Sequence, residues 1–497
     1  MYSSRIIPPD NQLNPELSVA HSRVSDRPAR VGLTTLLAGL LAIDALAGFG
    51  LPLLATAWIR TPTTGFMPVI LLAVVLTLCL IGLFGGYSPR LARRPSGQIR
   101  LVVAASLTAL CATALAAWAF DAGELVSAQW ALPAIVAGVA GIAAGRAIAG
   151  WLLARDRNGI YAPRTVVIGG GPTGASLMER LQNPRQRQPM EERVRLLGYV
   201  DGRPTLATDG SNIAPYLGGL AELLALIRCG DVDRVIIALP WSAQAPVLEL
   251  ISQLAECPIQ IQLARDPRVE FVTDRRRFDQ ELLRTGLLHV MDPPLSGLAS
   301  LVKRAEDLAI VAIVLLPCLP ILAAIAVAIR LDSPGPVLFR QLRTGFNNRD
   351  FQMWKFRTMH HHLADPEVRQ QITRNDPRVT RIGAWLRRTS LDELPQIFNV
   401  LRGDMSIVGP RPHAPGTRAG GRVFDQVVGD YAARHRVRPG VTGLAQVRGL
   451  RGPTETEAKL VSRVDSDLEY IETWSLWLDL RLLAQTAYAV LRMKNAC

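Results

Sequence analysis

Long apolar runs constrain this chain more than any other feature of its sequence. Hydrophobic residues make up 49% of its 497 residues, and many of them fall in runs near the length of about 20 residues that a helix needs to cross a bilayer. Four such runs lie in the first third of the chain, at 31–58, 66–84, 101–120 and 130–153. The sequence therefore predicts an integral membrane α-helical bundle over residues 31–155, preceded by a cytoplasmic N-terminal tail over residues 1–30.

The charges between these runs predict the orientation of the bundle. Basic residues precede the first run, separate the second from the third, and follow the fourth, whereas the other two loops carry only Arg60, Asp121 and Glu124. Loops rich in Lys and Arg remain on the cytoplasmic side. Both ends of the bundle are therefore expected in the cytoplasm.

The net charge of +13 predicts an anionic partner beside the membrane. Anionic lipid headgroups and phosphorylated substrates both fit such a surface. The chain has no recognisable nucleic-acid-binding motif, which argues against nucleic acid as the partner. Its six cysteines are scattered without C-x-x-C spacing, so neither a disulfide framework nor a zinc site is expected. The His360–His362 triplet is not expected to bind metal, because consecutive side chains point in different directions.

Strand and helix patterns alternate between residues 163 and 290. This order predicts an α/β doubly wound (Rossmann-like) domain with a parallel sheet. A turn after its first strand has the dinucleotide-binding spacing, with Gly169, Gly171 and Gly174. Asp201, the candidate ribose-binding acid, lies 27 residues beyond Gly174, later than the expected distance of about 20 residues. We favour glycines that shape the turn over a bound NAD, and the second interpretation stays open.

A fifth apolar run, residues 308–329, also has the length of a membrane span. Both of its flanks are basic, which opposes a crossing by the positive-inside rule. Pro317 and Pro320 lie near its middle, where each removes a backbone donor and disfavours a straight helix. The pattern favours a re-entrant membrane hairpin, broken at the two prolines, over a spanning helix or a soluble core helix.

Two adjacent carboxylates, Asp392 and Glu393, lie in a segment rich in cations. Arg411 follows them between two prolines, and five arginines precede them: Arg374, Arg378, Arg381, Arg387 and Arg388. Carboxylates that act on a phosphate need cationic neighbours, and the planar guanidinium of Arg binds phosphate oxygens bidentately. A structural alternative is a capping box, in which Ser390 and Glu393 open a helix.

Sequence blocks between residues 303 and 494 resemble those of the bacterial sugar transferase family. They include 355–359 (KFRTM), 390–396 (SLDELPQ), 403–412 (GDMSIVGPRP) and 438–443 (RPGVTG). The four membrane runs and the α/β domain ahead of these blocks are similar to the long-form members, among them the undecaprenyl-phosphate glucose-1-phosphate transferases. The resemblance implies an α-rich monotopic catalytic domain over residues 300–497, which contains the re-entrant segment.

The resemblance also implies a reaction. A hexose-1-phosphate, expected to be glucose-1-phosphate, passes from a UDP-sugar to undecaprenyl phosphate with Mg²⁺, as the first step of exopolysaccharide repeat-unit assembly. The implied partners are these two substrates and membrane lipids, at the cytoplasmic face of the bacterial inner membrane, and a homo-oligomer is left open. The alternatives are transfer of galactose-1-phosphate or another sugar phosphate, a membrane-anchored NAD-binding oxidoreductase, and a non-catalytic scaffold.

Residue roles follow from the same resemblance. Asp392 would attack the β-phosphorus, release UMP and carry the sugar phosphate as an acyl phosphate. Glu393 would bind metal or act as a base, and both carboxylates are candidate Mg²⁺ ligands. Arg411 is the expected phosphate clamp, and further phosphate contacts are expected from Lys355, Arg357, Arg378 and Arg438.

Overall fold

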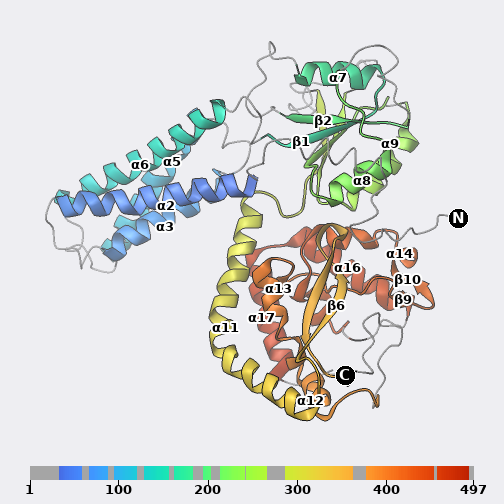
Figure 1. The fold of residues 1–497 in the computed structure, drawn as a ribbon. Coiled ribbons are helices and arrows are strands. Elements are labelled where there is room, and N and C mark those ends of the chain that lie inside the picture. Colours follow the sequence, from blue (N-terminus) through green and yellow to red (C-terminus); the bar gives the residue numbers. More distant parts are fainter. Residues whose placement is uncertain are drawn as a thin grey trace.

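Three parts follow one another along the chain (Figure 1): an apolar helical bundle, an α/β domain and an α-rich domain. The computed structural model describes residues 33–58, 67–84, 86–87, 95–119, 128–155, 162–182, 194–202, 213–240, 242–265, 286–361, 376–450, 452 and 456–491. The predicted tail over residues 1–30 lies outside these ranges.

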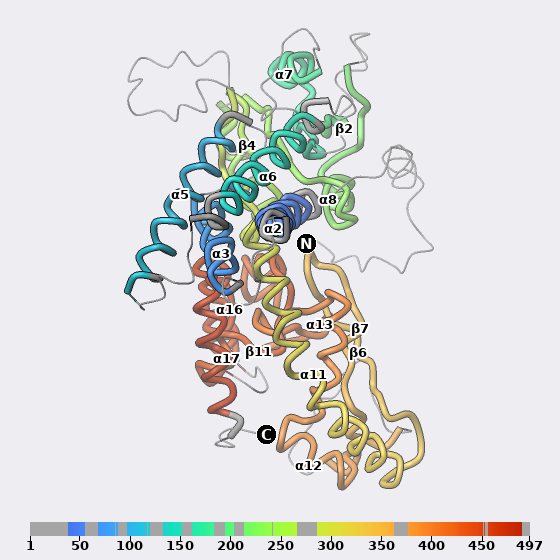
Figure 2. The backbone as a smooth tube through the Cα atoms, turned by 90° about the vertical axis from the view of Figure 1, so that its left-hand side faces the viewer, coloured from blue at the N-terminus to red at the C-terminus, as the bar shows by residue number. Residues whose placement is uncertain are grey.

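Four apolar helices form the bundle, and each overlaps one of the predicted runs. They are α2 (Leu33–Trp58), α3 (Met67–Leu83), α5 (Pro95–Ala119) and α6 (Ala128–Arg155). α2 packs along α6, and α3 packs along α5 (Figure 2). By length and composition, α5 and α6 contain stretches able to cross a membrane, whereas the apolar stretches of α2 and α3 are shorter, at Ala38–Leu54 and Pro68–Leu83.

A buried ion pair joins α2 to α6 inside the bundle. Asp44 and Arg146 are both shielded from solvent. Arg146 also donates to the Gln98 side chain at 2.7 Å and to the Gly86 carbonyl at 2.8 Å, while the Tyr87 hydroxyl donates to Asp44 at 2.8 Å. A charge buried among apolar helices is tolerated only when it is paired, so these contacts fix how the helices meet.

The α/β domain is built on one five-stranded sheet, in the order β2-β1-β3-β4-β5. Its elements are β1 (Arg164–Ile168), α7 (Pro172–Gln182), β2 (Arg195–Val200), α8 (Leu220–Arg228), β3 (Arg234–Ile237), α9 (Gln244–Ala255), β4 (Gln260–Ala264) and β5 (Leu287–Met291). The first four strands in chain order pair in parallel, as predicted, but β5 pairs antiparallel with β4. The sheet is therefore mixed, and the expectation of an all-parallel sheet was wrong at this edge.

Helices cover both faces of this sheet. Val166 of β1 belongs to a buried cluster with Leu223 of α8 and Leu254 of α9. Val167, the next residue, belongs to a separate cluster with Leu177 of α7. Successive side chains of a strand point to opposite faces, so the continuous apolar run of β1 is explained by burial on both sides.

The long helix α11 (Leu298–Asp332) leads from the α/β domain along the α-rich domain. It remains one helix across Pro317 and Pro320 and curves toward α12 in its second half (Figures 1 and 2). The helix therefore does not end at these prolines, because one turn can lose a backbone hydrogen bond without the helix ending. Only 11% of its apolar stretch is buried, and Ile313 and Leu316 are more than 70% exposed.

The α-rich domain surrounds three small two-stranded sheets. The elements after α11 are β6 (Leu338–Thr344), η3 (Phe346–Asn348), β7 (Asp350–Phe356), α12 (Arg381–Thr389), η5 (Leu391–Glu393), α13 (Gln396–Arg402), β8 (Ser406–Val408), β9 (Arg418–Ala419), β10 (Arg422–Val423), α14 (Phe424–Val427), η6 (Tyr431–Arg436), β11 (Gly440–Thr442), α15 (Leu444–Val447), α16 (Glu457–Thr473) and α17 (Leu476–Leu491). β6 and β7 form an antiparallel hairpin, and β8 pairs in parallel with β11.

The tip of the β6–β7 hairpin contacts the α/β domain. Asn347 donates a side-chain hydrogen bond to the Ile227 carbonyl at 2.7 Å, and Arg349 donates to the Arg228 carbonyl. Both acceptors lie at the C-terminal end of α8, where helix carbonyls have no partner within the helix. The hairpin thus connects the two domains.

Candidate active site

Asp392 and Glu393 lie in η5, a single 3₁₀ turn between α12 and α13. Ser390 ends α12 in the left-handed conformation, with φ of 56°, and its side chain makes no capping hydrogen bond to the turn that follows. The Glu393 side chain contacts Lys355 and Arg411 instead. The capping-box alternative was therefore wrong. Ser390 ends α12, and the carboxylates lie in the separate turn that follows it.

Two cations hold the Glu393 carboxylate. The ammonium of Lys355, on β7, lies 2.9 Å from Oε1. Arg411 contacts both carboxylate oxygens, with its Nη1 3.2 Å from Oε2. Burial acts to raise the pKa of Glu393, but the charges of Arg411 and Lys355 outweigh it and hold that pKa well below its usual range. Glu393 is therefore a fixed anion whose oxygens are already engaged.

Asp392 has the opposite environment. Toward the residues that the structure describes, its carboxylate forms no hydrogen bond or ion pair, and it is half-buried. Burial raises the pKa of Asp392 against the opposing charge of Lys355, and the neighbouring charge of Glu393 raises it further. Adjacent carboxylates with pKa values moved in opposite directions are suited to different tasks. Among the described residues, Asp392 is thus the member of the pair whose carboxylate oxygens have no hydrogen-bond or ion-pair partner.

Two further arginines interact electrostatically with this pair, and the predicted site residues did not include them. Arg387, on α12, lies in the electrostatic field of Asp392 and donates to the Thr358 hydroxyl at 2.8 Å. Arg343, on β6, is influenced by both Arg411 and Glu393, and burial together with the charge of Arg411 lowers its pKa to about 10. Arg387 belongs to the arginine-rich segment noted above, but only the pairing of β6 with β7 brings Arg343 here.

Two predicted phosphate contacts are engaged elsewhere. Arg378 pairs with Asp376 at 2.6 Å within its own turn, and its hydrogen bonds lower the pKa of Asp376 to about 2. Arg357 donates to the Ser333 and Pro334 carbonyls, at 2.6 Å each, just beyond the end of α11. Its contacts hold the chain where it leaves that helix.

Arg438 lies at a different place from the carboxylate pair. Its side chain lines a cavity of about 120 Å³ together with Lys303, Asp307 and Tyr470. The structure brings Lys355 and Arg411 into contact with Glu393 and does not place Arg438 there by any contact among the described residues. The phosphate contacts expected of these residues stay a prediction.

The carboxylate pair offers few oxygens for a metal ion. Over the described ranges, no group of three or more His, Cys, Asp or Glu side chains gathers in a way that could hold a metal. Mg²⁺ commonly takes one or two carboxylates and completes its shell with water and substrate phosphates. The unpaired oxygens of Asp392 fit that pattern, whereas the oxygens of Glu393 are engaged by cations. The site fits a Mg²⁺ that arrives with a phosphorylated substrate.

The glycine-rich turn of the α/β domain is tightly packed. Gly169 has φ of 106°, and a Cβ at Gly174 would lie 1.9 Å from the Gly169 carbonyl oxygen. The Asp201 carboxylate accepts the Gly170 N–H at 2.8 Å. The backbone conformation explains Gly169, and the lack of room for a Cβ explains Gly174. Gly171 is not explained in this way, because a Cβ there would meet open space.

A half-buried carboxylate pair that is surrounded by Lys and Arg, next to a long exposed apolar helix, defines a membrane-associated enzyme of phosphate chemistry. Residues 298–493 match the family model of the bacterial sugar transferases, and residues 82–264 match that of a CoA-binding domain.

Three curated relatives are similar to this chain. The undecaprenyl-phosphate glucose phosphotransferase of Komagataeibacter xylinus is 41% identical over 67% of this chain and 60% of its own length. The UDP-glucose:undecaprenyl-phosphate glucose-1-phosphate transferase of Escherichia coli (strain K12) is 40% identical over 68% of this chain and 69% of its own length. The exopolysaccharide production protein PSS of Rhizobium leguminosarum bv. phaseoli is 51% identical over 38% of this chain and 94% of its own length. The chain belongs to the bacterial sugar transferase family.

Proposed function

We propose that this chain transfers glucose-1-phosphate from UDP-glucose to undecaprenyl phosphate, at the start of exopolysaccharide assembly. The names of the Komagataeibacter, Escherichia and Rhizobium relatives support the substrates and the pathway. The observation that carries the proposal is the unpaired Asp392 carboxylate beside Glu393, which Lys355 and Arg411 hold in place. None of these three relatives is named as an oxidoreductase, so that alternative gains no support from them.

The first half of the reaction forms a bond to Asp392. One carboxylate oxygen attacks the β-phosphorus of UDP-glucose, and the bond from that phosphorus to the bridging oxygen breaks. UMP leaves with the electron pair, and the glucose phosphate remains as an acyl phosphate. Arg411 and Lys355 would neutralise the negative charge on the phosphate oxygens, and their contact with Glu393 supports this role because it keeps them oriented.

The second half releases the product. A phosphate oxygen of undecaprenyl phosphate attacks the same phosphorus, the bond to Asp392 breaks, and the free carboxylate is restored. The product is a lipid diphosphate that carries glucose. Mg²⁺, held by Asp392 and by phosphate oxygens of the substrate, would supply charge neutralisation.

The test of this proposal compares UDP-sugars on the full-length chain in detergent. Purified protein is mixed with undecaprenyl phosphate and radiolabelled UDP-glucose, UDP-galactose or UDP-N-acetylgalactosamine, and both UMP and label in the organic phase are measured. We expect the fastest turnover with UDP-glucose. A faster reaction with another sugar would overturn the assignment of glucose, and no UMP from any of them would overturn the reaction.

We also propose a membrane placement for the active site. The four apolar helices would cross the bacterial inner membrane, α11 would enter and leave it at the cytoplasmic face, and the α/β part would be a Rossmann-like domain in the cytoplasm. The exposed apolar surface of α11 supports this placement. So do Trp385 on α12, 47% exposed, and Trp477 on α17, 76% exposed, since Trp side chains favour the membrane interface.

Cysteine labelling tests this placement of α11. Ala305 and Arg340 flank its apolar stretch and are both exposed. Each is replaced by Cys in a background that lacks the native cysteines. A membrane-impermeant maleimide is expected to label both positions only after the cytoplasmic side is opened. Labelling of Arg340→Cys from the outside of intact cells would show that α11 crosses the membrane.

A further inference from the structure

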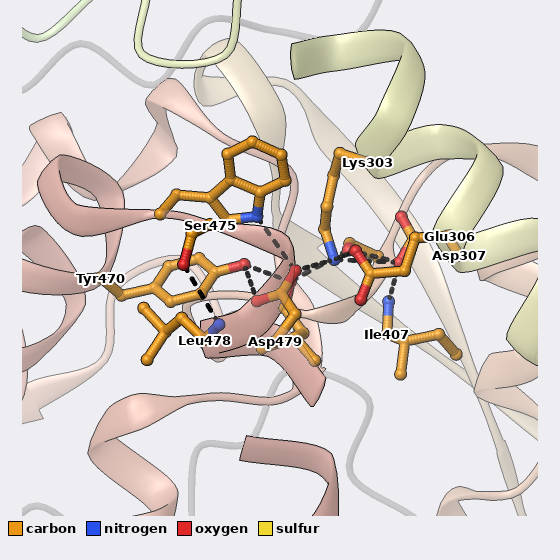
Figure 3. Close-up of polar contacts among 11 residues, drawn as sticks. Lys303, Glu306, Asp307, Ile407, Tyr470, Ser475, Leu478 and Asp479 are labelled. Carbon is orange, nitrogen blue, oxygen red and sulfur yellow. Dashed lines mark hydrogen bonds and ion pairs between the residues drawn. The ribbon is translucent and has the colours of Figure 1, made fainter. Parts of the chain in front are cut away.

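Lys303, near the start of α11, lies buried among three carboxylates (Figure 3). Its ammonium is 2.7 Å from Asp479 of α17, 3.2 Å from Asp307 and 3.5 Å from Glu306. All four side chains are shielded from solvent. One cation does not balance three carboxylates, so this arrangement needs further hydrogen bonds to be tolerated in the interior. Asp307 receives them from β8, and Asp479 receives them from Tyr470 and from the Trp474 indole.

Asp307 and Asp479 both connect to β8. The Asp307 carboxylate accepts the Ile407 N–H at 2.9 Å and the Ser406 hydroxyl at 2.8 Å. The Tyr470 hydroxyl lies 2.9 Å from Asp479 and 3.0 Å from the Val408 carbonyl. A phenol has one proton to share between these two acceptors. Every residue of β8 is therefore contacted by the charged cluster directly or through Tyr470.

The chain between β8 and Arg411 has little freedom. Gly409 donates to the Thr442 carbonyl at 2.8 Å, and the Pro410 carbonyl accepts the Gly440 N–H at 2.9 Å. A Cβ at Gly409 would lie 2.6 Å from a backbone oxygen, so the strand fits closely against its neighbour. The segment that joins β8 to Arg411 is therefore held against β11.

The far end of this segment is held as well. The Arg411 carbonyl accepts a hydrogen bond from Arg434 at 2.7 Å, and Arg434 pairs with Asp467 of α16 at 2.6 Å. Asp467 and Tyr470 lie one turn apart on the same helix. The polar face of α16 thus contacts the segment from β8 to Arg411 at both ends.

We propose that Lys303, Asp307, Asp479 and Tyr470 are positioning residues that set Arg411 against Glu393, and that α11 is connected to the active site through them. The inference rests on the proposed function. Misplacing a group in an active site by about 1 Å can lower a rate about 100-fold, so a cluster remote from the carboxylate pair can control turnover. α11 also carries the exposed apolar stretch, and its residue Asp307 bonds β8. The depth of α11 in the membrane would therefore determine the position of β8.

The test begins with Tyr470→Phe, which removes the hydroxyl and keeps the ring. Turnover of UDP-glucose by the full-length chain is expected to fall about tenfold, the equivalent of 1.4 kcal/mol, with a smaller change in KM. The matched control is Glu469→Gln, on the same helix. Its partner Arg448, at 2.6 Å, is 44% exposed and forms no hydrogen bond or ion pair with β8. The control is expected to keep turnover within about twofold, since exposed ion pairs contribute little.

A double-mutant cycle separates positioning from general stabilisation. Tyr470→Phe is combined with Arg411→Lys, which keeps the positive charge but loses the bidentate contact with Glu393. If Tyr470 acts through Arg411, the double variant is expected to be as slow as Arg411→Lys alone, within about twofold. A full additional tenfold loss would overturn the inference while the wild-type chain still releases UMP. A wild-type chain without UMP release would instead overturn the proposed function, and this inference with it.

Discussion

Replacing each of the adjacent carboxylates by its amide should separate catalysis from stability. Glu393→Gln removes the charge that Lys355 and Arg411 share. Breaking a fully buried pair costs about 3–5 kcal/mol, and an exposed pair is worth about 0.2–1 kcal/mol. The side chains of Glu393 and Lys355 are 19% and 18% exposed, and that of Arg411 is 35% exposed. We therefore expect the free energy of unfolding to fall by about 1–3 kcal/mol, discounted for this exposure.

Asp392→Asn should behave differently. Asp392 has no ion pair with described residues to lose, and burial and Glu393 already favour its neutral form by raising its pKa. The amide should leave the free energy of unfolding unchanged or higher, by about 1 kcal/mol at most. Turnover should nevertheless fall by several orders of magnitude, because the attacking charge is gone.

The assay measures UMP release and the thermal midpoint on the same preparations. One kcal/mol corresponds to about 2–4 °C for a domain of 150–250 residues, so the two variants are resolvable. The mechanism is refuted if Asp392→Asn retains a tenth of the wild-type turnover. If Asp392→Asn lowers the thermal midpoint as much as Glu393→Gln does, the assignment of the stabilising ion pairs to Glu393 alone is refuted.

Three other changes have definite expected outcomes. Lys355→Met removes a charge that lowers the pKa of Asp392, so the acidic limb of the pH–rate profile should move to higher pH; a shift to lower pH would contradict this electrostatic reading. Gly174→Ala should destabilise the α/β domain, measured by thermal unfolding, while Gly171→Ala, which meets open space, should not; equal midpoints would count against turn packing. Arg146→Met should lower bundle stability by about 3–5 kcal/mol by leaving a buried carboxylate unpaired, and an unchanged helical melting curve in detergent would disprove that.

The sequence alone determined the features that depend on neighbours along the chain. Each of the four apolar runs forms a helix, because the length and apolar character of a run are properties of consecutive residues. The glycine spacing after β1 became a tight turn before α7, since a Cβ at Gly174 has no room. The adjacent carboxylates could be singled out because their motif is continuous in sequence.

Only the tertiary structure decided which partners these groups have. Lys355 reaches Glu393 across 38 positions of sequence, whereas Arg378 pairs with its near neighbour Asp376. The partner of Arg378 is a sequence neighbour, but the pairing of Lys355 with Glu393 depends on the packing of β7 against η5. A long charged side chain pairs with whatever carboxylate or carbonyl the packing brings within reach. The buried position of Lys303 was hidden for the same reason, because its partner Asp479 is 176 positions away and only the docking of α17 on α11 brings the two charges together.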